Sequence, residues 1–437
     1  MRLDIINGLR GWAVIGVLLW HVPLVGTYAN GLGLTTPIDV AGMPVQLMAP
    51  LLQTWQSVNL FFFLSGFVLF LPYVNGQRTM TSWDDLGGFY KTRAKRLLPL
   101  YVLVVLVTTL FAYMHHGENW QGFYYNLFIM LTFGYHFVPG EQFYAPLSTP
   151  MWSLAPEVYF SILFPLLVVA IRRLGFWPTM IAGCALALAT RIAAIAVWPV
   201  SETNQYVHPW ADSILGRLDD FLFGMVAAHL YHHKWFAKSE SKALLLTLLG
   251  IVIWSAGAYG WSIYGLWTVQ GQQVLPPLTK PFLNYAFNVG PIFLVLGLAH
   301  SGRTIRWIWS VWPIQLLGMM CYSIYLWHWP VMFLSTHRGG THHLDPHSVL
   351  VFLGYTLAIA SITYRYVEFG HVRDGWLLFK PLPPLPSPGA GKDTVDLPHQ
   401  AQPTVPLPAA GTTGAMPPRL ESAVPPAPAG TTPRPPA

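Results

Sequence analysis

The sequence predicts an all-α integral membrane protein of about ten transmembrane helices, and three observations lead to that fold class. Of 437 residues, 53% are hydrophobic and only 10% are Asp, Glu, Lys or Arg, whereas soluble globular proteins average about 25% charged residues. Aromatic residues make up 15% of the chain. Apolar runs of about 18 to 24 residues recur, each long enough to cross a hydrocarbon core of about 30 Å. A soluble enzyme, a collagen and a disulfide-rich secreted module are therefore excluded.

Ten apolar runs within residues 1–380 give the predicted spans. They are 9–29, 51–73, 97–114, 150–171, 176–198, 213–232, 243–262, 281–300, 312–335 and 347–369. Residues 120–137 are also apolar and aromatic, but the segment is short and contains Asn126, Gly134 and His136. We predict that it is re-entrant or interfacial, and that protein or a cavity covers its backbone.

The distribution of positive charge supports this count. If 120–137 does not cross the membrane, fifteen Lys and Arg residues fall on one side, and only Lys280 and Arg338 fall on the other. A full crossing would remove the asymmetry. Because positive residues concentrate in cytoplasmic loops, we expect a multi-pass protein of the inner or plasma membrane with both termini cytoplasmic. The formal charge of +6 then needs no nucleic-acid partner.

A second, smaller region follows the membrane domain. Seventeen of residues 381–437 are proline, and none is aromatic. Such a segment cannot bury enough apolar surface to fold, so we predict a disordered Pro/Ala/Thr-rich cytoplasmic tail. The tail is either an inert linker or a tether for a partner protein that the sequence does not identify.

Cysteine and histidine usage gives no metal signature. Cys184 and Cys321 lie in apolar runs, so we interpret both as buried thiols. Eight of the 16 histidines fall on the predicted outer loops or at span mouths: His115, His116, His136, His208, His337, His342, His343 and His347. No spacing among them is diagnostic of a metal site. We predict solvated loop histidines and no bound metal.

The first predicted span contains two ionisable residues, which are costly inside a membrane. Arg10 and His21 are eleven residues apart, which places them on one face of a helix and about 16 Å apart along its axis. They are either a functional pair, or a cation that extends to the membrane surface and a histidine bonded to a neighbouring helix.

The basic segment 91–96 precedes the third predicted span, and Pro99 suits the first turn of that span. The segment is either a topology anchor or a phosphate site. Arg93 and Arg96 are three residues apart, so they share a helix face and can bind one phosphate group together.

Two further polar segments interrupt apolar spans. Ser65 and Gly66 break an aromatic run, where small residues permit close helix packing. Catalysis by Ser65 would require an adjacent base. Glu157 lies near the outer start of the fourth predicted span. It is expected either to pair with a cation or to serve proton transfer.

The later spans contribute two more candidates. Arg217 and Asp220 lie three residues apart in the sixth predicted span, which favours an ion pair within one helix. His328 lies in the outer half of the ninth predicted span between two tryptophans, a position also typical of an interfacial histidine.

In this order, the elements resemble the acyltransferase-3 family of integral membrane acyltransferases. The matching segments are Arg10 to His21, Phe63 to Phe67 (Phe-Leu-Ser-Gly-Phe), Arg93 to Arg96, Trp152 to Glu157 (Trp-Ser-Leu-x-x-Glu) and Ser323 to Pro330 (Ser-x-Tyr-Leu-x-His-x-Pro). The ordered set is specific although each motif alone is weak. The family often ends its last span with Arg followed by Glu-x-Pro, whereas Phe369 and Gly370 follow Glu368 here. The resemblance is to the stand-alone members, without a C-terminal esterase-like domain.

The resemblance implies an enzyme that transfers an acyl group, by default acetyl, from cytoplasmic acyl-CoA to a hydroxyl of a cell-surface or lipid-linked glycan. Acyl-CoA would be a cosubstrate, and no bound cofactor is expected. The resemblance implies catalytic candidates at His21, Glu157 and His328, and donor-binding candidates at Arg10, Arg93 and Arg96.

The implied roles differ in detail. His21 would be a general base or an acyl carrier. Glu157 would orient His21 or position the sugar, and His328 would polarise the thioester carbonyl or help bind the acceptor. Tryptophans at the outer mouth could stack on sugar faces, namely Trp152, Trp327 and Trp329.

Two other classes of protein fit the composition. One is a ten-span transporter or flippase of a polar or glycolipid substrate, although the sequence shows no internal repeat of the kind common in transporters. The other is a non-catalytic scaffold that carries the tail.

Overall fold

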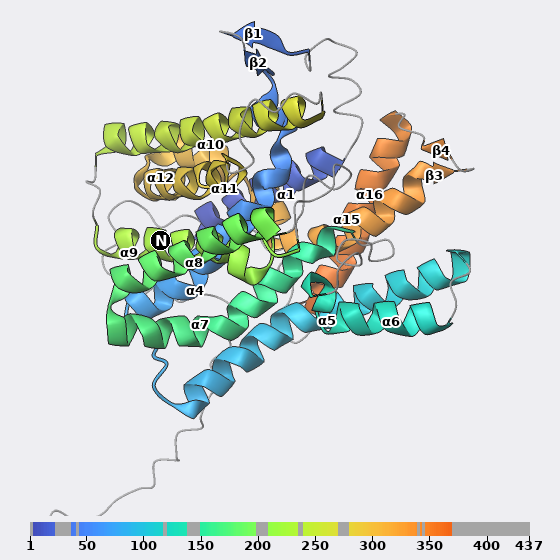
Figure 1. Ribbon diagram of the computed structural model, residues 1–437, viewed down its shortest axis with the longest axis horizontal. Helices are drawn as coiled ribbons and strands as arrows, with labels where there is room; N and C mark the ends of the chain where they lie inside the picture. Colours follow the sequence, from blue (N-terminus) through green and yellow to red (C-terminus); the bar gives the residue numbers. More distant parts are fainter. Residues whose placement is uncertain are drawn as a thin grey trace, which may run out of the picture. The chain divides into compact units, whose positions relative to one another are not determined.

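A computed structural model describes the protein at residues 3–21, 36–40, 43–116, 120–137, 149–197, 209–234, 239–269, 279–338, 341–342 and 346–368. The chain divides into two units, Met1–Gly389 and Ala390–Ala437, and every described residue belongs to the first. The described part is built almost entirely of helices (Figure 1). The predicted tail, and the predicted domain boundary after residue 380, lie outside the described residues.

The described helices follow one another in this order along the chain. The first eight are α1 (Leu3–His21), α3 (Ala49–Leu52), α4 (Ser57–Val74), α5 (Trp83–His116), α6 (Trp120–Leu131), α7 (Leu154–Leu174), α8 (Phe176–Val197) and α9 (Ile214–His232). The others are α10 (Glu240–Val269), α11 (Thr279–Leu283), α12 (Ala286–His300), α13 (Arg303–Trp309), α14 (Trp312–Met319), α15 (Cys321–Thr336) and α16 (Pro346–Thr363). Three 3₁₀ helices span Thr54–Gln56, Gly134–His136 and Thr149–Ser153, and a π-helical turn spans Tyr364–Glu368.

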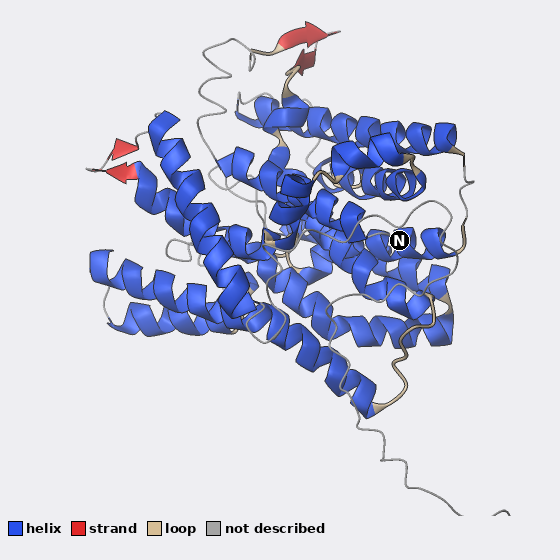
Figure 2. Cartoon of the chain, turned by 180° about the vertical axis from the view of Figure 1, so that it is seen from behind, coloured by secondary structure: helices blue, strands red, loops and turns tan. Residues whose placement is uncertain are grey.

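The strands are few and short. Antiparallel pairs form between β1 (Ile38–Val40) and β2 (Met43–Val45), and between β3 (His337–Arg338) and β4 (Thr341–His342). Seen from behind, they are two small hairpins beside a helical bundle (Figure 2).

Seven of the described helical segments are long and apolar enough to cross a membrane. They are Thr54–Val74, Trp83–Met114, Pro150–Leu174, Phe176–Val197, Glu240–Ile263, Pro281–His300 and His347–Glu368. These match seven of the ten predicted spans and support a multi-pass membrane protein. The other three predicted spans correspond to α1, α9 and the segment 312–335. A count of ten, and the orientation of the termini, stay predictions.

The segment 312–335 differs from its prediction, because it forms two helices, α14 and α15, instead of one. Met320 separates them as the C-cap of α14, with φ −89° and ψ 7°. Gly318 lies just before this break, where a Cβ atom would collide with the carbonyl oxygen of Asn7 in α1. The close approach of two backbones explains the glycine at this position.

The third predicted span also differs, because α5 begins at Trp83, fourteen residues before the predicted start at 97. The basic segment 91–96 is therefore helical, and Pro99 lies in the helix interior instead of the first turn. Pro99 lacks an N–H group, so one intrahelical hydrogen bond is missing there.

The segment 120–137 forms α6 and a short 3₁₀ helix, which run back along the second half of α5. The hydroxyl of Tyr101 donates to the carbonyl oxygen of Met130 at 2.6 Å, and the rings of Tyr113 and Phe123 are 5.5 Å apart. With 12 residues, α6 is about 18 Å long and shorter than a full span. Its predicted re-entrant or interfacial placement stays a prediction.

Close packing between α4 and α9 organises the core. A Cβ atom at Gly66 would collide with the carbonyl oxygen of Phe221, and one at Gly224 with that of Phe63. The expected packing role of the Ser-Gly pair is therefore confirmed for Gly66. Around this contact the ring of Phe221 stacks on Phe160, with centroids 4.1 Å apart.

Candidate functional site

His21 and His328 lie in contact, although 307 residues separate them in the sequence. His21 is the last residue of α1, and His328 lies in the middle of α15. Nδ1 of His21 is 3.2 Å from Nε2 of His328. The ring of Trp329 meets His21 edge-on at 5.0 Å. His328 is completely buried, whereas His21 is half-buried.

The hydrogen bonds of the pair define which nitrogen atoms carry protons. Nδ1 of His328 lies 2.5 Å from the carbonyl oxygen of Tyr325, which can only accept, so Nδ1 is the protonated nitrogen. In the neutral ring, Nε2 of His328 then accepts a hydrogen bond. Nδ1 of His21 donates to it and to the carbonyl oxygen of Val17 at 2.9 Å. Nε2 of His21 consequently carries a lone pair, which is what a general base requires.

Ser65, Arg93 and Glu157, which come from three different motifs, form one polar cluster. Arg93 donates to Oε1 of Glu157 at 2.7 Å, and the hydroxyl of Ser65 donates to the same oxygen at 3.0 Å. Nε of Arg93 also donates to Ser161 at 3.0 Å. The side chains of Arg93 and Glu157 are only 12% and 15% exposed. Of its two expected alternatives, Glu157 therefore pairs with a cation, and among the described residues its side chain forms no hydrogen bond with His21.

Arg10 and Arg96 are the two other cations near this cluster. Arg10 interacts electrostatically with Arg96, Glu157 and Arg93. Among the described residues, neither Arg10 nor Arg96 forms a hydrogen bond or an ion pair, and both are half-buried. Half-buried guanidinium groups without an anion are suited to binding a phosphate group.

The packing of α1 beside α15 connects the two parts of the site. Arg10 and His21 lie on one face of α1, about 16 Å apart along its axis. On α15, Cys321 lies within electrostatic range of Arg10, and His328 contacts His21. Cys321 and His328 are seven residues apart, so they also share a helix face. The paired helices thus have cations at one end and the two histidines at the other.

Glu368 is a site residue that the sequence analysis did not select. It is 1% exposed and lies in the π-helical turn after α16. Its Oε2 accepts a hydrogen bond from Ser323 at 2.8 Å, and Arg96 and Arg10 act on it electrostatically. The sequence signal for Glu368 is its place in the last-span motif, three residues after Arg365.

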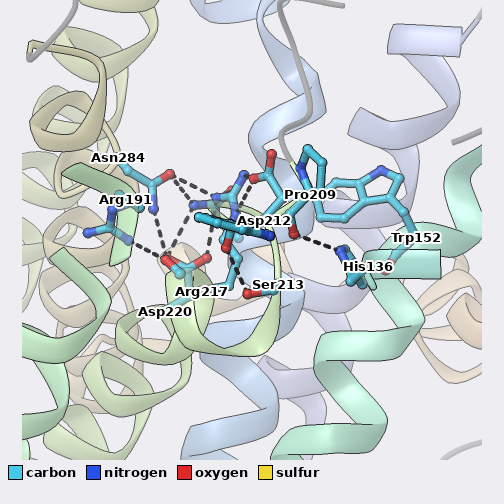
Figure 3. Close-up of polar contacts among 12 residues, drawn as sticks. His136, Trp152, Arg191, Pro209, Asp212, Ser213, Arg217, Asp220 and Asn284 are labelled. Atoms are coloured by element: carbon cyan, nitrogen blue, oxygen red, sulfur yellow. Dashed lines mark hydrogen bonds and ion pairs between the residues drawn. The ribbon is translucent and has the colours of Figure 1, made fainter. Parts of the chain in front are cut away.

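A second buried polar cluster lies around the start of α9 (Figure 3). Arg217 donates to Asp212 at 2.7 Å and to Asp220 at 3.4 Å, which confirms the expected pair within one helix. Asp220 also accepts hydrogen bonds from Asn284 at 2.9 Å and from Asn288 at 2.7 Å. Because these residues join α9 to the start of α12, the cluster also fixes the packing of the two helices.

A neighbouring ion pair ties α8 to α9. Arg191 binds both carboxylate oxygens of Asp219, at 2.8 Å and 2.5 Å, and its side chain and that of Asp219 are 5% and 0% exposed. Arg191 also donates to the carbonyl oxygen of Gly216 at 2.7 Å. Both terminal nitrogen atoms of Arg191 are therefore engaged in structure, whereas its buried Nε has no hydrogen-bond partner among the described residues.

The structure changes the interpretation of several aromatic and histidine side chains. His136, expected to be a solvated loop residue, is buried between the carbonyl oxygens of Pro209 and Trp152, at 3.2 Å and 3.0 Å (Figure 3). Trp152 is itself buried. Trp327 is buried too and donates to Thr363 at 3.1 Å. Neither tryptophan presents an open ring face to a sugar.

The structure also bears on the two cysteines and on the possibility of a metal site. Cys321 is buried as expected, whereas Cys184 is only half-buried. Among the residues that the structure describes, no group of three or more His, Cys, Asp or Glu could hold a metal ion.

Comparison with known proteins matches this chain to membrane acyltransferases. A family model described as an acyltransferase domain, of the acyltransferase-3 type, matches residues 3–365. The O-acetyltransferase OatA of Staphylococcus aureus (strain NCTC 8325 / PS 47) is 23% identical over 398 residues, which are 86% of this chain and 58% of that protein. The peptidoglycan O-acetyltransferase OatA of Listeria monocytogenes is 22% identical over 403 residues, 85% of this chain and 56% of that protein.

The chain thus spans less than two thirds of the length of these curated relatives. No solved structure matches the chain significantly.

Proposed function

Because the chain belongs to the acyltransferase-3 family, we propose that it moves an acyl group, by default acetyl, from cytoplasmic acyl-CoA to a hydroxyl of a cell-surface or lipid-linked glycan. The names of the relatives support an O-acetyl product, and one names peptidoglycan as the glycan. The observation that carries the proposal is the α1–α15 pair, with cations that lack an ion-pair partner among the described residues at one end and a histidine lone pair at the other.

In the proposed donor complex, Arg10 and Arg96 bind the phosphates of CoA through their N–H groups. Arg93 lies beside them, and Glu157 and Ser161 hold its guanidinium in place. Glu157 then acts by positioning Arg93. The pantetheine arm of CoA is comparable in length to the roughly 16 Å that separates Arg10 from His21 along α1, so the thioester reaches the histidine pair.

At the histidine pair, Nε2 of His21 takes the proton of the acceptor hydroxyl as the oxygen attacks the thioester carbonyl. The carbon–sulfur bond breaks, the ester forms, and the imidazolium returns the proton to the CoA thiolate. His328 keeps the ring of His21 oriented and its Nδ1–H engaged. In the acyl-carrier alternative, the acyl group would pass through the same nitrogen atom.

The test uses the full chain in lipid nanodiscs with acetyl-CoA and a soluble peptidoglycan fragment. We expect release of CoA thiol that requires the acceptor, and a mass increase of the glycan by one acetyl group. His21→Ala should lower the rate of both signals by about 100- to 10,000-fold, and Arg10→Ala should raise the KM for acetyl-CoA. Turnover retained in His21→Ala would remove it from both proposed roles. A trapped acyl-histidine would favour the carrier over the base.

A transporter would give a different result. Wild-type protein that consumes no acetyl-CoA with any glycan, yet moves a labelled glycolipid across a liposome membrane, would replace this proposal.

A further inference from the structure

The proposed function leaves one buried charge without a role, the carboxylate of Glu368. Within the described part of the chain, its one hydrogen bond comes from Ser323, and no ion pair reaches it. A carboxylate buried this deeply is costly in a membrane protein unless a cation compensates it. Its place in a π-helical turn is also unusual, because such turns occur mostly at functional sites. Both observations indicate a role beyond packing.

The surroundings of Glu368 identify the site in which it acts. The π-helical turn packs directly against α5. Tyr322, the neighbour of Ser323, donates to the carbonyl oxygen of Leu97 at 2.7 Å. The start of α15 and the π-helical turn therefore meet α5 next to Arg96.

The charges around the donor site do not cancel. Three guanidinium groups, of Arg10, Arg93 and Arg96, lie near two carboxyl groups, of Glu157 and Glu368, which leaves a net charge of +1 when both carboxyl groups are ionised. Glu157 is bonded to Arg93. Glu368 attracts Arg96 and Arg10 without contact, so it offsets their charge while their N–H groups stay free for a ligand. In its ionised form, the carboxylate of Glu368 also repels the phosphates that the arginines bind.

We propose that Glu368 is a positioning residue that weakens the hold of Arg10 and Arg96 on the phosphates of CoA, so that CoA leaves after acyl transfer. The inference rests on the proposed function, since it assigns the donor to this site. Without the anion, the site would carry a charge of +2 toward a strongly anionic product. Product release would then limit turnover, as it does in many enzymes.

The test neutralises the anion and keeps its shape. Glu368→Gln retains an oxygen that accepts the hydrogen bond of Ser323, and a neutral amide is less costly to bury than a carboxylate. In nanodiscs we expect the Kd for CoA to fall about tenfold, the KM for acetyl-CoA to fall with it, and kcat to decrease. The salt dependence of CoA binding should become steeper, because one more uncompensated cation faces the phosphates.

Two controls separate this role from a structural one. Glu368→Asp keeps the charge and should bind CoA as the wild type does. Asp212→Asn removes another buried negative charge, from the second polar cluster, and should leave the Kd for CoA unchanged. A Kd for CoA that rises or stays constant in Glu368→Gln, in protein with wild-type thermal stability, would overturn the proposal.

The design also separates the two proposals. Wild-type protein that binds CoA but acylates no glycan would refute the proposed function, and the CoA affinity of Glu368→Gln would still decide the role of Glu368.

Discussion

Substitution of His328 tests whether the two histidines act as one catalytic unit. His328→Phe keeps an aromatic ring in the buried position but removes the acceptor for the Nδ1–H of His21. That hydrogen bond is the longer branch, 3.2 Å, of a shared donation whose other branch reaches Val17 at 2.9 Å. Its loss is therefore worth about 1 kcal/mol, a rate decrease of roughly fivefold. His21→Ala removes the proposed base and should cost about 100- to 10,000-fold.

The double variant gives the decisive measurement. If His328 acts only through His21, the double variant should be no slower than His21→Ala alone, so the coupling energy equals about 1 kcal/mol. The assay is acceptor-dependent release of CoA thiol in nanodiscs, with thermal unfolding as a check on folding. His328→Gln, which restores an acceptor oxygen, should recover part of the rate. Losses that multiply in the double variant would refute the shared role and give His328 an independent one.

Three further predictions concern donor binding and stability. Arg96→Gln removes a guanidinium that has no ion-pair partner in the described part of the chain, so the KM for acetyl-CoA should rise about 10- to 100-fold with little change in kcat. An unchanged KM in steady-state kinetics would exclude Arg96 from the donor site. Asp219→Asn leaves Arg191 buried without its counter-ion, so the free energy of unfolding in mixed detergent micelles should fall by about 3 kcal/mol. A loss under about 1 kcal/mol would show that the ion pair of Arg191 and Asp219 contributes little to stability. Gly66→Val forces a side chain against the carbonyl oxygen of Phe221, so the free energy of unfolding in the same measurement should fall by about 1 to 3 kcal/mol. Unchanged stability would show that α4 and α9 can move apart at no cost.

The membrane spans could be predicted because hydropathy is a local property of the sequence. An apolar run of about 20 residues must be helical in lipid, since only a helix satisfies its own backbone there. Seven of the predicted spans accordingly match described helices that could cross a membrane. The common helix of Arg10 and His21 was predictable for the same reason, since both lie in α1.

Helix ends were predicted less well, because packing decides them. The chain continues α5 through the charged residues 91–96, where Glu157 on α7 binds Arg93 and Lys91 and Lys95 are exposed. It breaks between α14 and α15 next to Gly318, where α1 approaches closely. The local sequence around these helix ends does not indicate that α7 or α1 packs there.

The sequence by itself determined the fold class, the order of the motifs and the face shared by Arg10 and His21, because each depends on residues close together in the chain. Only the tertiary structure decided that His328 contacts His21, that Glu157 binds Arg93, and that Ser323 binds Glu368. Those contacts join residues 307, 64 and 45 positions apart. Such distant residues meet only where helix packing brings their faces together, and no local pattern specifies that meeting.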